Sequence, residues 1–308
     1  MALAANVNFS IKVSSASFLA IAAAVGALAA QLPESRGSET RKPMAHVVSK
    51  DGAKIAFEKT GIGPAVIIVG GALSDRKGGK PLAALLAEHF TVYILDRRGR
   101  GESTDAKTYA VEREIEDLGA LINHAGGSAY LYGVSSGAAL VLQTAGKLGP
   151  IKVPKLALYE PPYSSNDEKQ KQEFAGQKQR VLELIKTGRP GDAAAYFLMA
   201  IGIPPEALEK MKASPEWEAI KKSDFTLAYD YAVLGDGTVP QAIAEAIAVP
   251  ALVLDGEKTM EFMHATADRV AKLIPGAGRK TLKGQTHQAA PEVTAPVLIE
   301  FFKRSNKE

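Results

Sequence analysis

Cysteine is absent from this chain of 308 residues. Its absence excludes a thiol nucleophile, disulfide bonds and a lipoprotein anchor, and it leaves the redox compartment open. The formal net charge is only +3, which is too small to indicate a nucleic-acid partner. The five histidines are scattered and show neither H-x-x-x-H nor H-E-x-x-H spacing, so the sequence predicts no metal site and no metal cofactor.

The N-terminal part of the chain differs from the rest. Val13 to Ala30 is an uncharged apolar stretch, and Ala27 to Ala29 resembles a small-x-small processing site. These features predict an export signal over residues 1–30 and a polar linker over 31–43, which gives a secreted or periplasmic protein with no stable membrane association after processing. The alternative is a misplaced start, with Met44 beginning a cytoplasmic protein, because the first predicted strand follows it directly.

Strands and helices alternate along the remaining chain. This alternation predicts an α/β fold, in which a mostly parallel sheet is covered by helices on both faces. A hydrophobic content of 46% and a charged content of 23% are typical of a packed core. Strands are predicted at residues 45–48, 54–57, 65–69, 90–95, 129–132, 155–159, 251–254 and 279–282, and a last helix near residues 291–303.

No strand is predicted between Pro161 and Val249. Helices are predicted there at residues 168–187, 192–201, 205–213 and 216–234. An insertion at this point lies above the carboxyl ends of the strands, where ligands bind in open α/β sheets. We therefore expect a core built from residues 44–162 and 248–308, and a helical cap over 163–247. Each aromatic side chain of the cap is expected to pack between helices rather than to contact substrate, but as a group these side chains are consistent with an apolar lid.

A Gly-x-Ser-x-Gly motif, Gly133 to Gly137, stands between a predicted strand and a predicted helix. Glycines on both sides of Ser135 leave room where a β-carbon would clash, so the hydroxyl can stand clear of the backbone. The following helix offers free N–H groups to an oxyanion. The pattern predicts a nucleophilic serine, and the alternative is a tight turn with a capping serine.

Four motifs in order resemble those of bacterial α/β-hydrolases. They are Asp-Arg-Arg-Gly-Arg-Gly (Asp96 to Gly101), Tyr-Gly-x-Ser-Ser-Gly-Ala (Tyr132 to Ala138), Leu-Tyr-Glu-Pro-Pro (Leu158 to Pro162) and Gly-Gln-Thr-His (Gly284 to His287). The resemblance extends from about Met44 to the C-terminus. It implies an α/β-hydrolase fold with a serine hydrolase activity that needs no cofactor.

His287 is the predicted base. It lies in a turn between the last predicted strand and the last helix, and a hydroxyl becomes a good nucleophile only when an imidazole removes its proton. The other four histidines fall outside the loop where this fold places its base, and we interpret them as surface or capping residues. They are His46, His89, His124 and His264.

The acid departs from the common pattern of the family. Most α/β-hydrolases place an Asp three residues after the Gly that follows the seventh strand, and here that position holds Thr259. Three carboxylates remain: Asp255, Glu257 and Glu160. We favour Glu160, because it ends the strand after the serine strand, Pro161 and Pro162 fix the chain that leaves it, and some relatives, the mycotoxin lactone hydrolases among them, use a Glu at this strand end.

The oxyanion hole needs two backbone donors. Ser136 supplies one N–H by its place after the predicted nucleophile. Similarity to relatives indicates the Ala72 N–H as the second donor, and the Gly71 N–H is the alternative. The glycines at 70 and 71 allow the backbone to approach a substrate closely. The usual His-Gly of this loop is absent.

Asp96 to Ser103 is charged and glycine-rich, but it lacks the spacing of a phosphate-binding loop. We interpret it as a tight turn whose side chains tie loops together.

Together, the motifs and the resemblance predict a serine hydrolase that cleaves a carboxylic ester or lactone through an acyl-enzyme. A C–C bond hydrolase, a perhydrolase, or a ligand-binding protein with slow turnover are the alternatives. An epoxide hydrolase or dehalogenase is disfavoured, since those relatives carry Asp where Ser135 stands.

Overall fold

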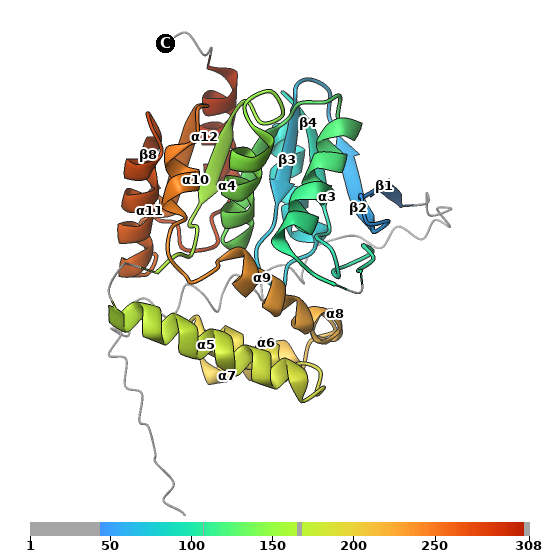
Figure 1. Cartoon of the computed structure of the whole chain (residues 1–308), viewed down its shortest axis with the longest axis vertical. Coiled ribbons are helices and arrows are strands. Elements are labelled where there is room, and N and C mark those ends of the chain that lie inside the picture. The colour runs from blue at the N-terminus through green and yellow to red at the C-terminus, as the bar shows by residue number, and fades with distance from the viewer. Residues whose placement is uncertain (1–43, 107, 165–167, 305–308) are drawn as a thin grey trace, which may run out of the picture.

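The computed structural model describes residues 44–106, 108–164 and 168–304. These residues form a sheet of eight strands in the order β1-β2-β4-β3-β5-β6-β7-β8 (Figure 1). β2 pairs antiparallel with β1 and β4, and the remaining pairs are parallel, as the sequence predicts. The strands are β1 (Ala45–Val48), β2 (Lys54–Thr60), β3 (Ala65–Val69), β4 (Thr91–Leu95), β5 (Tyr130–Val134), β6 (Leu156–Tyr159), β7 (Ala251–Gly256) and β8 (Gly278–Leu282).

Helices cover both faces of the sheet. One face carries α3 (Val111–His124), α4 (Ser136–Leu148), α10 (Gln241–Glu245) and α11 (Glu261–Leu273), and the other carries α2 (Lys80–Leu86), after the short η2 (Arg76–Gly79), and α12 (Pro291–Lys303). Along β3, Ile67 and Val69 belong to the first core, whereas Val66 and Ile68 belong to the second. Successive strand residues point to opposite faces, so an unbroken apolar run is needed to bury both.

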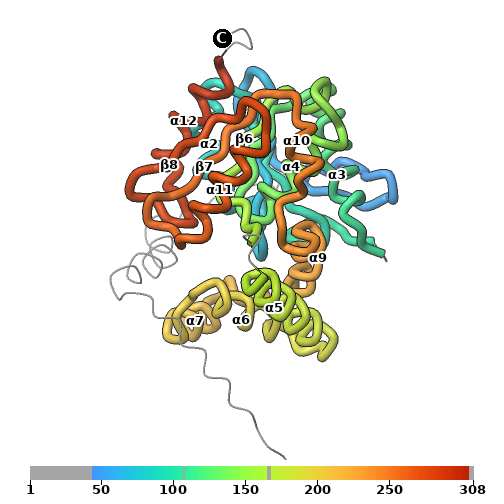
Figure 2. The backbone as a smooth tube through the Cα atoms, turned by 60° about the vertical axis from the view of Figure 1, so that its left-hand side comes forward, coloured from blue at the N-terminus to red at the C-terminus, as the bar shows by residue number. Residues whose placement is uncertain are grey.

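The helices between β6 and α10 gather beyond one end of the sheet (Figures 1 and 2). They are α5 (Glu168–Lys186), α6 (Asp192–Ala200), α7 (Pro205–Lys212), α8 (Trp217–Ser223), η3 (Asp224–Thr226) and α9 (Leu227–Val233), and we call them the cap helices. Ala72 and Leu73, which follow β3, pack against apolar side chains of these helices. The cap helices therefore lie at the end of the sheet where the parallel strands finish.

One predicted helix is wrong. The sequence predicts a continuous helix over 216–234, but the structure divides it into α8, η3 and α9. Side chains at the break bond to the backbone: Asp224 accepts from the Gly191 N–H at 2.6 Å, and the Thr226 hydroxyl donates to the Ser223 carbonyl at 2.6 Å. Such bonds compete with helical ones, and the change of direction turns α9 toward the core.

The predicted export signal and linker, residues 1–43, lie outside the described residues, so export stays a prediction. Within the ranges that the structure describes, no helix combines the length and the apolar character that a bilayer crossing requires.

Candidate functional site

Ser135 stands at the junction between β5 and α4. Its backbone has φ 56° and ψ −127°, outside the regions that side chains normally favour. The flanking glycines permit this turn: a β-carbon at Gly133 would lie 2.5 Å from the Gly137 carbonyl oxygen, and one at Gly137 would lie 2.4 Å from the Val69 carbonyl oxygen. The spacing of the motif is therefore a steric requirement of the bend.

Glu160 and His287 lie together although 127 residues separate them. Glu160 follows β6 and is fully buried, and its Oε2 lies 2.5 Å from His287 Nδ1. Its Oε1 accepts a hydrogen bond from the Gly256 N–H at 2.7 Å. A carboxylate on Nδ1 leaves the other imidazole nitrogen to accept a proton. No hydrogen bond between His287 and the Ser135 hydroxyl occurs in the described part of the chain, and such bonds often tighten only when substrate binds.

Thr259 takes part in this arrangement, which the sequence did not predict. Its hydroxyl donates to Glu160 Oε2 at 2.9 Å. The position that holds an acid in most α/β-hydrolases thus holds a donor to the carboxylate at the other strand end. The hydroxyl of Tyr159 also donates to the carbonyl of Thr286, which ties the His287 loop to β6.

The two rival carboxylates have other partners. Asp255 is fully buried and accepts two hydrogen bonds from the Arg279 guanidinium at 2.7 Å each, while His264 Nδ1 lies 2.5 Å from it. Burial raises the pKa of Asp255, but the hydrogen bonds from Arg279, Thr281 and His264 outweigh it and hold the pKa below its ordinary value. Glu257 accepts from the Gly284 N–H at 2.8 Å and is exposed. Neither carboxylate reaches His287.

Asp255→Asn should lower the stability of the protein at neutral pH by about 1–3 kcal/mol, because it removes the charge that holds Arg279. A carboxyl whose pKa is lowered by folding contributes stability above its unfolded pKa and loses it as pH falls through the folded value. The difference between wild type and variant should therefore stay constant from pH 7 to 5 and shrink below about pH 4. Urea unfolding at each pH measures this difference in stability. A difference that grows toward low pH would contradict a lowered pKa of Asp255.

The loop after β3 lies against Ser135. A β-carbon at Gly71 would lie 3.0 Å from the Ser135 β-carbon. The Gly71 carbonyl accepts hydrogen bonds from Arg100 Nη1 at 2.9 Å and from the Ser74 hydroxyl at 2.7 Å. The structure thus brings this loop and Ser136, the first residue of α4, to the predicted nucleophile.

Three non-glycine residues of the described chain have a positive φ: Leu73 (57°), Ser135 (56°) and Glu160 (46°). Each follows the carboxyl end of a parallel strand, and two are predicted site residues. Such conformations cost about 1–3 kcal/mol each and persist where the surroundings enforce them, which is common at functional sites. The sequence contains no signal for the strain at Leu73.

The charged turn after β4 ties the molecule together, as its composition predicts. Arg97 donates to Glu114 at 2.6 and 2.7 Å, and Arg98 donates to Asp117 at 2.7 and 2.8 Å. Asp96 pairs with Arg76. These partners occupy the guanidinium groups, so the interpretation as a turn that joins loops is confirmed.

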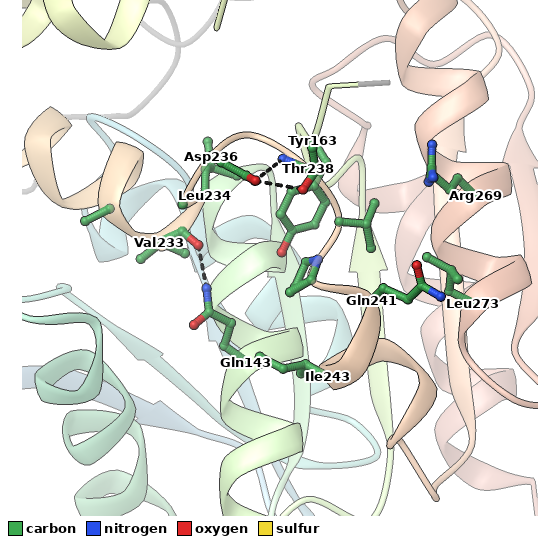
Figure 3. Close-up of a pocket in the computed structure, with 14 residues that line it drawn as sticks. Gln143, Tyr163, Val233, Leu234, Asp236, Thr238, Gln241, Ile243, Arg269 and Leu273 are labelled. Atoms are coloured by element: carbon green, nitrogen blue, oxygen red, sulfur yellow. Dashed lines mark hydrogen bonds between the residues drawn. The ribbon is translucent and has the colours of Figure 1, made fainter. Parts of the chain in front are cut away.

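A cavity of about 510 Å³ lies between α4, the segment from α9 to α10, and α11 (Figure 3). Its lining includes none of the three predicted catalytic residues. The Gln143 side chain donates to the Val233 carbonyl, and Asp236 accepts from both the backbone N–H and the hydroxyl of Thr238 (Figure 3). This cavity therefore lies beside the attachment of the cap helices and is not the candidate active site.

A mainly parallel sheet of this strand order, with a serine in the bend after β5 and helices inserted after β6, defines the α/β-hydrolase fold. A model of the alpha/beta hydrolase family matches residues 66–298. The chain belongs to this family, and its membership supports a hydrolase activity.

Solved structures agree with this assignment. An alpha/beta hydrolase from Sphaerobacter thermophilus DSM 20745 is 46% identical, with a TM-score of 0.76, over 84% of this chain and 100% of that one. An esterase from Exiguobacterium antarcticum is 19% identical, with a TM-score of 0.68, over 85% of this chain and 100% of the other. An enol-lactonase from Burkholderia xenovorans LB400 is 18% identical, with a TM-score of 0.63, over 84% of this chain and 100% of that one. The latter two show the shared fold.

Proposed function

We propose that the protein is a serine hydrolase that cleaves a carboxylic ester or lactone through an acyl-enzyme. Ser135 attacks the carbonyl carbon while His287 removes its proton. His287 then returns that proton to the leaving alkoxide, and the C–O bond breaks. Water, deprotonated by His287, hydrolyses the acyl-enzyme and regenerates Ser135.

The contact between Glu160 and His287 is the observation that carries this proposal. A buried carboxylate at 2.5 Å from Nδ1 fixes the imidazole tautomer and stabilises the imidazolium that forms during attack. The backbone N–H groups of Ala72 and Ser136 are the proposed donors to the oxyanion. The esterase and the enol-lactonase of the same fold support the choice of an acyl–oxygen bond as the target.

The cap helices favour a substrate with an apolar acyl group. The apolar side chains of the cap helices form two clusters, and Leu73 packs against both; Phe197 and Tyr231 belong to these clusters. Because Ala72 and Leu73 pack against these apolar side chains, a group bound to the proposed oxyanion donors would lie beside an apolar layer. We expect apolar acyl esters to be better substrates than esters of dicarboxylic acids.

Rapid mixing with p-nitrophenyl butyrate tests the acyl-enzyme. We expect a burst of p-nitrophenolate close to one equivalent per protein, followed by steady turnover, because p-nitrophenolate is a good leaving group that departs during acylation and the hydrolysis of the acyl-enzyme is then the slower step. A burst with negligible turnover would indicate a ligand-binding protein. Absence of both, together with no labelling of Ser135 by a fluorophosphonate, would refute the proposed function.

A further inference from the structure

A buried ionic cluster connects the cap helices to the loops around Ser135. Its members are Arg97, Arg100, Glu114 and Asp230, and none is more than 3% exposed. Two positive and two negative groups make the cluster neutral. Asp230 lies on α9 and is the member that the cap helices supply, whereas the other three belong to the core. The cluster is therefore complete only when α9 is seated on the core.

The first connection runs from Asp230 to Ser136. Asp230 Oδ1 accepts hydrogen bonds from the Ser136 hydroxyl at 2.7 Å and from Arg97 Nη1 at 2.8 Å. Arg97 is in turn held by both oxygens of Glu114. Because Ser136 opens α4, an anchor on its side chain fixes the first turn of the helix and the direction of the Ser136 N–H.

The second connection runs from Asp230 through Arg100 to Gly71. Arg100 Nη2 donates to both oxygens of Asp230 at 2.9 Å, while Nη1 of the same guanidinium donates to the Gly71 carbonyl at 2.9 Å. In a trans peptide the carbonyl and the following N–H point in opposite directions. A fixed Gly71 carbonyl therefore directs the Ala72 N–H to the side away from Arg100.

Asp230 keeps its charge in this environment. Burial raises the pKa of its carboxyl, but the charges of Arg100 and Arg97 and the hydrogen bond from Ser136 outweigh burial and hold the pKa below its ordinary value. A planar guanidinium that serves two acceptors at once cannot be replaced by a lysine ammonium without losing this geometry.

We propose that Asp230 is a positioning residue that aligns both oxyanion donors, so that the seating of α9 assembles the oxyanion hole. The inference rests on the proposed function, in which the Ser136 and Ala72 N–H groups receive the oxyanion. Asp230 acts through Ser136 and Arg100 and does not touch the substrate. Its removal should therefore weaken transition-state binding and leave ground-state binding nearly intact.

Asp230→Asn should lower kcat for p-nitrophenyl butyrate by about 10- to 100-fold, with KM changed by less than about threefold, because loss of one complete donor costs about 10²–10³. The diagnostic measurement compares this ester with its thionoester, whose sulfur accepts hydrogen bonds weakly. The ester-to-thionoester ratio of kcat/KM should fall by at least about fivefold, since only the oxygen substrate depends on aligned donors.

Ser136→Ala is the second variant. It removes the hydrogen bond to Asp230 and the one that Arg97 Nη1 donates to the Ser136 hydroxyl at 3.2 Å, but it leaves the backbone N–H and the pairs of both arginines with Asp230 in place. It should lower kcat by about three- to tenfold and shift the substrate ratio in the same direction. Glu218→Gln is the matched control, since Glu218 is an exposed cap-helix carboxylate paired with Lys221. It should change neither quantity.

An unchanged substrate ratio in both variants would overturn the inference, even if kcat falls, because a general loss of structure affects both substrates alike. Amide hydrogen exchange of residues 70–74 tests the same point without any substrate. Asp230→Asn should speed exchange there, and unaltered exchange would count against the inference. Failure of the proposed function is distinct, because it would show as absence of wild-type esterase activity and of labelling at Ser135.

Discussion

Ser135→Ala should abolish ester hydrolysis, with kcat/KM reduced by about 10⁴-fold or more. No thiol can replace the hydroxyl, since the chain contains no cysteine. The variant should remain folded, because alanine keeps the β-carbon and the backbone conformation of the bend. Steady-state rates with p-nitrophenyl butyrate measure the loss.

Ser223→Ala is the matched control for this prediction. The Ser223 hydroxyl bonds to the carbonyls of Ala219 and Ile220 within its own helix. The Ser223→Ala variant should retain full activity and full labelling by a fluorophosphonate, whereas Ser135→Ala should lose both. Labelling of another residue in Ser135→Ala, with activity preserved, would show that the nucleophile lies elsewhere.

Glu160→Gln should lower kcat by about 10²–10⁴-fold with KM nearly unchanged. Glutamine keeps the shape of the side chain, but it removes the charge that stabilises the imidazolium. Its amide also offers a donor where His287 Nδ1 needs an acceptor, which favours the wrong tautomer. The kcat and KM of the purified variant, measured at one pH, give the split.

Asp255→Asn is the natural comparison, because the described part of the chain contains two histidine–carboxylate pairs of equal length. Asp255 lies 2.5 Å from His264, as Glu160 does from His287. Asp255→Asn should cost less than about tenfold in kcat, since its carboxylate holds Arg279 and lies away from His287. If Asp255→Asn lost most of its kcat while Glu160→Gln stayed close to wild type, the acid of the site would be Asp255 on β7 and not Glu160. Circular dichroism of both variants establishes that they are folded.

Much of the fold follows from local signals in the sequence. The unbroken apolar runs of β3 to β7 indicate strands buried on two faces, and the helical segment after β6 indicates an insertion at the carboxyl ends of the strands. The requirement for Gly133 is local too, because the clash that it avoids is with the Gly137 carbonyl four residues further on. Such features depend on residue type and spacing, which the sequence states directly.

The sequence by itself thus determined the fold class, the serine bend, His287 as the predicted base and the charged turn that joins loops. It favoured Glu160 among three candidate acids, and only the tertiary structure showed which of them reaches His287. The tertiary structure alone also revealed three further features: the hydrogen bond from Thr259 to Glu160, the positive φ of Leu73 and the division of residues 216–234 into three helices.

Asp230 shows the physical reason most clearly. Its partners Arg97, Arg100 and Ser136 lie 133, 130 and 94 residues away. Local pattern cannot reveal a contact over such separations, because the cap helices must first dock on the sheet before these charges meet.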